Sequence, residues 1–393
     1  MSEWKRYKLN EIASLSNGIN FDKSAYASGI KLIGVSDFKD RIYPDYDSLQ
    51  EVDSKVVRSG DYLEKGDIVF VRSNGNKELV GRCMMINHDT PVTFSGFCIK
   101  LHLNDKNKFE PVYFNYLFRT TQFRKSMTGT AVGANIQNLS QSRLGNSEVI
   151  VPNIDTQHRI ASILSRYDSL IGNYQKQIKL LEEAAQRLYN EWFVDLRFPG
   201  HENTKIVNGV PEGWEKKKLI DLVDVQYGYT FDGRLFNSNG EGMPILRIRN
   251  IPDGITSDYT TEEASPNYII HDGDIVVGMD GIFHINSWNG GDAYLVQRAC
   301  SFRPKEERTK GFIFQAIQEP IKYFEQTLVG ATVAHLGKKH IDSIELIAPS
   351  NRDLYIPFQK GFNQRQYLLS QIRLLTEARD RLLPKLMSGG ITV

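Results

Sequence analysis

Two polar loops in the first half of the sequence carry side chains that could bind nucleic acid. The loops read VRSNGNKELVGR and ANIQNLSQSR, and both are rich in amides and guanidinium groups. A guanidinium group suits phosphate oxygens and guanine, while an amide can pair with adenine through two hydrogen bonds. The candidate DNA contacts in these loops are Arg72, Ser73, Asn74, Asn76, Lys77, Arg82, Asn135, Gln137, Asn138 and Arg143.

Two loops in the second half offer a different set of polar and basic side chains. They read GMDGIFHINSWNGG and ATVAHLGKKH. For any single residue, simple solubility explains a polar loop as well as DNA contact does. Taken together, the loops are more informative: the two halves share one scaffold but differ in the polar side chains of these loops. Two surfaces that read two different short DNA sequences would need such an arrangement. The candidates are Asp280, His284, Asn286, Thr332, His335, Lys338 and Lys339.

Evidence for catalysis is weak. The sequence has no P-loop for nucleotide hydrolysis, and no Pro-Pro step, which the target-amine motif of a DNA methyltransferase needs. Asp45, Asp53 and Lys55 imitate the spacing of a metal-dependent nuclease, but the second half has no equivalent, so an exposed acidic loop is the preferred interpretation. A nuclease is one alternative, and a scaffold that binds only protein is another. We predict no catalytic residue, no metal site and no cofactor.

Composition limits the remaining possibilities. A length of 393 residues predicts two or three domains. The formal net charge of +1 gives no overall basic field, so DNA binding must rest on local patches or on partner proteins. Cys83, Cys98 and Cys300 are too few and too far apart for a metal motif, and we expect them to be buried. Without a long apolar run or a signal peptide, the chain is expected to be cytoplasmic and to contact no membrane.

The sequence repeats itself. QIKLLEEAAQRL begins at residue 177 and QIRLLTEARDRL at residue 371, a separation of 194 residues. Gly18 similarly matches Gly228, EKGDIVFVRSNG matches HDGDIVVGMDG, and TGTAVGANIQ precedes an apolar strand in the first half as VGATVAHLGK does in the second. Each half therefore predicts a mostly β globular domain followed by one long helix.

Each long helix carries apolar residues at every seventh position, as a coiled coil does. These seam residues are Ile160, Tyr167, Tyr174, Leu181 and Leu188 in the first helix, and Leu368, Leu375 and Leu382 in the second. From Ile160 to Trp192 the first helix spans about 50 Å, too long to lie on one small domain, so the two helices should pack together. Gly361, Arg365 and Arg379 interrupt the second seam, and Pro384 should interrupt that helix.

The order of the elements predicts the direction of the helices. The first must deliver the chain to the second domain, and the second has only the first domain to return to, so they should be antiparallel. The predicted fold class is α+β, with two mostly β domains joined by two long antiparallel coiled-coil helices in a pseudo-twofold internal repeat.

Several segments resemble the specificity subunit of type I restriction-modification systems. They are EWFVDLRFPGHE, GVPEGWE, GMDGIFHINSWNGGDAYLVQRAC and LLPKLMSGG, and the resemblance covers essentially the whole chain. It implies that residues 1–153 and 199–350 are target recognition domains, each reading one half of a split site in double-stranded DNA. Residues 154–198 and 351–393 would be the central and C-terminal spacer helices.

The same resemblance implies a set of partners. The spacer helices, from Asp155 to Trp192 and from Leu354 to Leu386, would set the gap between half-sites and dock two methyltransferase (modification) subunits. Two restriction subunits, which also translocate DNA, would join through that complex. The chain itself would hold no active site and no cofactor.

Overall fold

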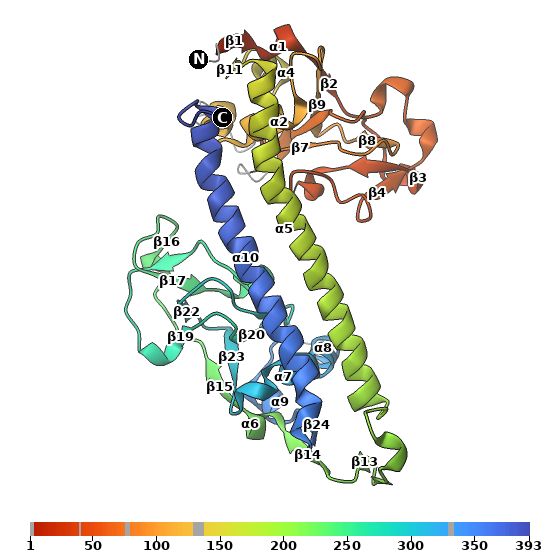
Figure 1. Ribbon diagram of the computed structural model, residues 1–393, viewed down its shortest axis with the longest axis vertical. Coiled ribbons are helices and arrows are strands. Elements are labelled where there is room, and N and C mark those ends of the chain that lie inside the picture. The colour runs from red at the N-terminus through yellow and green to blue at the C-terminus, as the bar shows by residue number, and fades with distance from the viewer. Residues whose placement is uncertain (1–3, 39–40, 75–78, 129–136, 329–333) are drawn as a thin grey trace. The chain divides into compact units, whose positions relative to one another are not determined.

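The computed structural model describes residues 4–38, 41–74, 79–128, 137–328 and 334–393 (Figure 1). The chain divides into two compact units. Unit 1 consists of Met1–Ile171 and Leu375–Val393, and unit 2 consists of Gly172–Leu374. None of the helices in the described ranges is both long enough and apolar enough to cross a membrane.

The described part of unit 1 is built on a four-stranded antiparallel sheet and a smaller mixed sheet. The large sheet has the order β2 (Ala13–Asn17), β9 (Cys98–Leu103), β5 (Ile68–Val71) and β7 (Cys83–Met85). The smaller has the order β4 (Gln50–Val52), β3 (Tyr26–Ile33) and β8 (Val92–Phe94). Two short pairs join β1 (Lys5–Lys8) to β11 (Glu148–Val151), and β6 (Ser73–Asn74) to β10 (Gln137–Asn138). The short helices are α1 (Leu9–Ile12), α2 (Pro111–Arg119), α3 (Thr121–Thr128) and α4 (Gln141–Gly145).

Strand β5 shows why the large sheet forms. Its sequence IVFV is buried along its whole length, and alternate side chains of a strand point to opposite faces. Ile68 and Phe70 join one core together with Tyr113 of α2, whereas Val69 and Val71 join a second core on the opposite face. The sheet is therefore covered on both sides, which explains a strand without polar residues.

The described part of unit 2 is built on a four-stranded sheet and a five-stranded sheet. One has the order β15 (Val223–Tyr227), β23 (Ala299–Pro304), β20 (Ile275–Gly278) and β21 (Ile285–Ser287). The other has the order β16 (Phe236–Asn237), β18 (Tyr259–Thr260), β17 (Met243–Leu246), β22 (Ala293–Leu295) and β19 (Ile269–Ile270). Two further pairs are β14 (Trp214–Lys218) with β24 (Glu345–Pro349), and β12 (Ile206–Val207) with β13 (Val210–Pro211). The short helices are α6 (Leu219–Leu222), α7 (Lys310–Ala316), α8 (Gln318–Thr327) and α9 (Lys338–Asp342).

The two units repeat one topology, as predicted. The order β2-β9-β5-β7 of unit 1 recurs as β15-β23-β20-β21 in unit 2, and the β1–β11 pair recurs as β14–β24. The parallel pairing of β3 with β8 likewise recurs between β17 and β22. The internal repeat is thus a repeat of structure as well as of sequence.

Gly18 and Gly228 explain one of the sequence matches physically. A Cβ atom on Gly18 would lie 2.2 Å from the carbonyl oxygen of Phe94, and one on Gly228 would lie 2.1 Å from that of Val296. Real side chains do not tolerate such distances. Only glycine lets the two backbone segments approach so closely at each of these positions.

The two long helices are α5 (Ile154–Tyr189) and α10 (Ile356–Met387), and they pack together (Figure 1). In unit 1, Arg379 Nη1 of α10 lies 2.5 Å from Asp168 Oδ1 of α5. In unit 2, Arg365 Nε of α10 lies 2.6 Å from Glu182 Oε1 of α5. The earlier α5 residue contacts the later α10 residue, so the helices are antiparallel as predicted.

The predicted helix seam is only partly shielded from solvent. Ile160 and Leu368 are buried, while the other seam residues are half-buried, namely Tyr167, Tyr174, Leu181, Leu188, Leu375 and Leu382. Full burial in α5 falls on the positions four residues further on, Leu164, Ile171 and Ile178. A pair of helices covers each seam from one side only, so side chains at the edges of the seam stay partly exposed to solvent.

The prediction that Pro384 interrupts the second helix is wrong, because α10 continues to Met387. Pro384 is exposed and lies in the last turn, so its missing N–H removes a single backbone hydrogen bond close to the end of the helix. Gly389, two residues after the end of the helix, has a φ of +72°. A Cβ on Gly389 would lie 3.1 Å from the ring of Trp4, so both chain ends meet in unit 1.

Candidate nucleic-acid interface

Two of the predicted loops meet in unit 1 although 66 residues separate Arg72 from Asn138. Strands β6 and β10 pair in antiparallel register, with Asn74 opposite Gln137 and Ser73 opposite Asn138. The N–H of Leu139 donates to the carbonyl oxygen of Arg72 at 2.8 Å. The Nε of Arg72 donates to Oδ1 of Asn138 at 3.3 Å. The fold therefore places a guanidinium and an amide from two loops side by side.

The remaining candidates of unit 1 lie around this pair or outside the described residues. Arg143 belongs to α4, and its Nη2 donates to the carbonyl oxygen of Ser126 at 3.0 Å. The carbonyl oxygen of Arg82 accepts from the N–H of Val71 at 2.9 Å, so Arg82 lies beside the end of β5. Asn76, Lys77 and Asn135 fall outside the described residues.

Unit 2 contains the corresponding contact between Asp280 and His335. These residues form an isolated antiparallel bridge, and His335 Nδ1 lies 2.6 Å from Asp280 Oδ1. The Nε of Arg298 lies 3.3 Å from the other oxygen of the same carboxylate. Asp280 is thus held between two groups that can carry positive charge.

Equivalent hydrogen bonds show that the two contacts occupy the same place in the fold. In unit 1, the N–H of Arg72 donates to the carbonyl oxygen of Phe97 at 2.8 Å. In unit 2, the N–H of Met279 donates to the carbonyl oxygen of Arg298 at 2.8 Å. The N–H of Leu336 donates to the carbonyl oxygen of Met279 at 2.7 Å. Ser73 and Asn138 in unit 1 therefore correspond to Asp280 and His335 in unit 2.

Other candidates of unit 2 lie on neighbouring segments. Lys338 and Lys339 are exposed in the first turn of α9, which begins three residues after His335. His284 is half-buried, and its carbonyl oxygen accepts from the N–H of Gly278 at 2.9 Å. Thr332 falls outside the described residues.

The structure places Asn286 differently from the other candidates, against α10. Its Nδ2 donates to the carbonyl oxygens of Ile251 at 2.9 Å and Pro252 at 3.0 Å. Its Oδ1 accepts from Nη2 of Arg365 at 2.8 Å. These contacts engage both ends of the amide and tie the β domain of unit 2 to the helix. Asn286 is not brought together with Asp280 and His335.

The residues of the alternative nuclease pattern have local structural partners. Arg41 Nη1 lies 2.6 Å from Asp45 Oδ2, and this hydrogen bond holds the pKa of Asp45 below its usual range. Asp53 Oδ1 accepts from the N–H of Lys55 at 2.9 Å and caps a short turn. Among the residues that the structure describes, no group of three or more His, Cys, Asp and Glu side chains could hold a metal ion.

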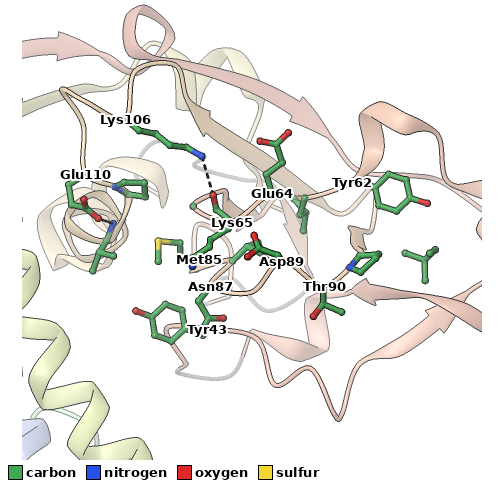
Figure 2. Close-up of a pocket in the computed structure, with 17 residues that line it drawn as sticks. Tyr43, Tyr62, Glu64, Lys65, Met85, Asn87, Asp89, Thr90, Lys106 and Glu110 are labelled. Atoms are coloured by element: carbon green, nitrogen blue, oxygen red, sulfur yellow. Dashed lines mark hydrogen bonds between the residues drawn. The ribbon is translucent and has the colours of Figure 1, made fainter.

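A pocket of about 1040 Å³ opens in unit 1 (Figure 2). Tyr43, Tyr62 and Met85 line it together with charged side chains, and Lys106 Nζ donates to the carbonyl oxygen of Lys65 at 3.2 Å. Of the candidate DNA contacts that the structure describes, none lines this pocket. The pocket and the candidate interface are therefore separate features of the unit.

Two residues at the candidate interface were missed in the sequence. Phe97 and Arg298 occupy equivalent positions, because each accepts the corresponding backbone hydrogen bond described above. Both are well exposed, at 61% and 67% respectively. Neither belongs to an amide-rich loop. The available signal was a large side chain in the short turn that leads into a buried strand, SGFCI and VQRAC.

Comparison with known proteins shows the family to which the chain belongs. A sequence model of the type I restriction modification DNA specificity domain matches residues 1–183 and 211–360. The type I restriction enzyme MjaIX specificity subunit of Methanocaldococcus jannaschii is 26% identical over 302 residues, which cover 72% of this chain and 69% of the relative. The MjaVIII specificity subunit of the same organism is 30% identical over 322 residues, covering 74% and 73%.

A solved structure shares the fold. The crystal structure of the type I restriction-modification system S subunit from M. genitalium matches with a TM-score of 0.58 at 17% sequence identity. The match covers 98% of this chain and 96% of that chain. Since the family's sequence model spans most of the chain, the protein belongs to the specificity subunits of type I restriction-modification systems, a non-catalytic family that forms part of DNA-binding complexes.

Proposed function

We propose that the two β-rich domains read the two halves of a bipartite site in double-stranded DNA. The observation that carries this proposal is one backbone arrangement with two sets of side chains. Unit 1 presents Arg72, Ser73 and Asn138 there, and unit 2 presents Asp280 and His335. A shared scaffold with different polar groups suits the recognition of two different base sequences.

The chemistry of each set fits base edges and phosphates. A guanidinium has five N–H donors, and Arg72 uses Nε on Asn138, so its terminal nitrogens have the geometry to approach guanine or phosphate. In unit 2, a carboxylate such as Asp280 can accept from the cytosine amino group. Its pairing with Arg298 and His335 reduces the repulsion between Asp280 and the DNA backbone.

We further propose that the helices act as a spacer between the two reading domains. The proposed parts are recognition domains at 1–153 and 199–350, with spacer helices at 154–198 and 351–393. Support comes from the two ion pairs between the helices: Glu182 follows Asp168 by the same 14 positions by which Arg365 precedes Arg379. Fourteen residues are two heptads, so both pairs fit one antiparallel register. Half-sites about one DNA turn apart, roughly 34 Å, suit such a spacer.

The helices are also the proposed docking site for two methyltransferase subunits, through which two restriction subunits would join. Large apolar side chains are exposed on both helices in unit 2, at Leu180, Tyr367 and Leu374. Tyr367 and Leu374 are seven positions apart and therefore lie on one face of α10, and contiguous exposed apolar patches are typical of surfaces that bind other proteins. Partner subunits would also supply phosphate contacts, which a chain with a formal charge of +1 cannot provide as a general field.

The test compares Arg72→Ala with His335→Ala in the complex with the methyltransferase subunit. Mapping methylated sites by sequencing should show that each variant relaxes base preference in one half of the motif and leaves the other half unchanged. Arg6→Ala is the control, because Arg6 is exposed, pairs with Glu148 and is not one of the candidate DNA contacts. Loss of both halves in either variant would contradict independent reading domains.

A further inference from the structure

The turn that carries Phe97 is part of the frame of the candidate interface. The N–H of Cys98 donates to the carbonyl oxygen of Ser95 at 2.8 Å and closes the turn. The carbonyl oxygen of Phe97 accepts from the N–H groups of Arg72 at 2.8 Å and Ser73 at 3.4 Å. The backbone of Phe97 therefore holds the segment that carries Arg72 and Ser73. The side chain of Phe97 belongs to the same candidate interface as these two residues.

The side chain of Phe97 is unusual for its surroundings. It is 61% exposed, although phenylalanine is normally buried. The adjacent residues Arg72, Ser73 and Asn138 are polar, so burial in the domain core does not explain a phenyl ring there. An apolar group at a polar nucleic-acid interface has one base-edge partner in the major groove, the 5-methyl group of thymine.

Arg298 is the equivalent residue of unit 2 and has its own unusual feature. Its φ is +70°, in the left-handed region of backbone conformation, which residues other than glycine, asparagine, aspartate and histidine seldom adopt. A bulky residue in this conformation costs folding free energy, and such residues cluster at functional sites. The guanidinium is 67% exposed, and Nε lies 3.3 Å from Asp280 Oδ2. This contact orients the group beside the Asp280–His335 bridge.

We propose that Phe97 and Arg298 are equivalent specificity-determining residues, one in each reading domain. Phe97 contacts the 5-methyl group of a thymine in one half-site. Arg298 donates to O6 and N7 of a guanine in the other, oriented by the carboxylate of Asp280. This inference rests on the proposed function, because it assumes that both surfaces face DNA.

The first test compares motifs selected from random DNA by complexes with the methyltransferase subunit. Phe97→Ala should flatten the preference for thymine at one position of one half-site, and Arg298→Ala should flatten a guanine preference in the other. Tyr26→Ala is the matched control, since Tyr26 is an exposed aromatic residue of β3 whose ring packs edge-on against Phe21. The control should leave the motif unchanged.

Conservative variants separate recognition from folding. Phe97→Leu keeps an apolar contact and should retain the thymine preference. Arg298→Lys keeps a donor but loses the planar guanidinium fork, so it should retain a weaker guanine preference than the wild type and a stronger one than Arg298→Ala. Thermal unfolding should show the wild-type transition for all variants, because both side chains are exposed. If a variant fails to fold, the motif of its conservative partner decides the question.

Deoxyuridine provides the second test, because it lacks the 5-methyl group. Replacing the assigned thymine by deoxyuridine should weaken binding of the wild-type complex by about fourfold, because the burial of one methyl group is lost. The same replacement should have no effect on Phe97→Ala. Motifs that are identical in the wild type and in both alanine variants would overturn the inference alone. A wild-type complex that selects no motif would overturn the proposed function and the inference together.

Discussion

Arg379 interrupts the apolar seam of α10, and its contacts in unit 1 explain why a charged residue is tolerated there. Arg379 and Asp168 each have side chains only 12% exposed, and the hydroxyl of Tyr116 also donates to Asp168. Burial by itself would lower the pKa of Arg379, but Asp168 and Asp380 outweigh burial and raise it. The guanidinium therefore stays charged and compensates the carboxylate inside the helix pair.

Removal of this arginine should destabilise unit 1. Arg379→Ala leaves Asp168 largely buried without its cation, and the expected loss is about 3 kcal/mol in the free energy of unfolding, measured with urea. Arg187→Ala is the control, since Arg187 is 84% exposed and lies 3.9 Å from Glu183, so its loss should stay below about 1 kcal/mol. Equal losses in both variants would show that Arg379 contributes only as an exposed charge.

The three cysteines were expected to be buried, and the structure confirms this. Burial raises the pKa of Cys83 to about 12 and also raises the pKa values of Cys98 and Cys300. At pH 8 a disulfide reagent such as dithiobis-nitrobenzoate should therefore react slowly with the native chain and quickly with all three thiols in urea. Rapid reaction of the native chain would contradict the buried positions.

The same raised pKa values predict a pH dependence of stability. The folded thiols keep their protons above pH of about 8.5, where unfolded thiols ionise. Stability is therefore fully present below this pH and declines as the pH rises above it, by up to about 1.4 kcal/mol per pH unit for each thiol. A chain with all three cysteines replaced by alanine should lose part of this slope between pH 8.5 and 9.5. An unchanged slope would assign it to other groups.

At the scale of elements, local patterns predicted the strands and helices well. The run EKGDIVF predicted β5, and HDGDIVV predicted β20, because an apolar β-branched run after a Gly-Asp turn has few alternatives. The heptads predicted α5 and α10, and the order of elements predicted their direction. These features depend on residues close together in sequence or on connectivity alone.

Contacts between distant segments could not be predicted in the same way. The pairing of Ser73 with Asn138 joins two strands of only two residues, which are too short to give a periodic signal. Asn286 lies in a segment whose sequence is as polar as those of surface loops, yet its amide accepts a hydrogen bond from Arg365 of α10. Composition identifies a polar residue, but only the tertiary fold decides whether its partner is protein or solvent.

The helix pair should set the distance between the two half-sites. It should tolerate inserted residues only when both helices are lengthened so that their ion pairs stay opposite each other. We expect seven residues inserted in α5 between Asp168 and Glu182, together with seven in α10 between Arg365 and Arg379, to preserve both ion pairs. This change adds about 10 Å of helix and should widen the gap in the methylation motif by about three base pairs. The half-sites should stay the same.

The matched control inserts seven residues in α5 only. It separates the two ion pairs from their common register, so unfolding should begin at a lower urea concentration and the motif should weaken. If the double insertion leaves the gap unchanged, the helices do not set the spacing, and their role is limited to holding partner subunits.

At the scale of the whole molecule, the repeated topology predicts modular recognition. Replacing residues 72–82 together with 137–138 by the corresponding segments of a relative with another specificity should change one half of the motif. Both segments must be exchanged, because β6 and β10 pair with each other. Sequencing of methylated DNA measures the outcome, and a change in both halves would show that the two units do not read DNA independently.

The most direct measurement is selection from random double-stranded DNA by the chain bound to its methyltransferase subunit, with the chain alone in parallel. We expect the complex to select a motif with two unlike halves and a fixed gap, and the chain alone to enrich the same motif more weakly. A stable complex that enriches no motif would contradict recognition of a bipartite site and favour a protein scaffold, in which the repeated helices bind partner proteins and do not set the spacing between DNA half-sites.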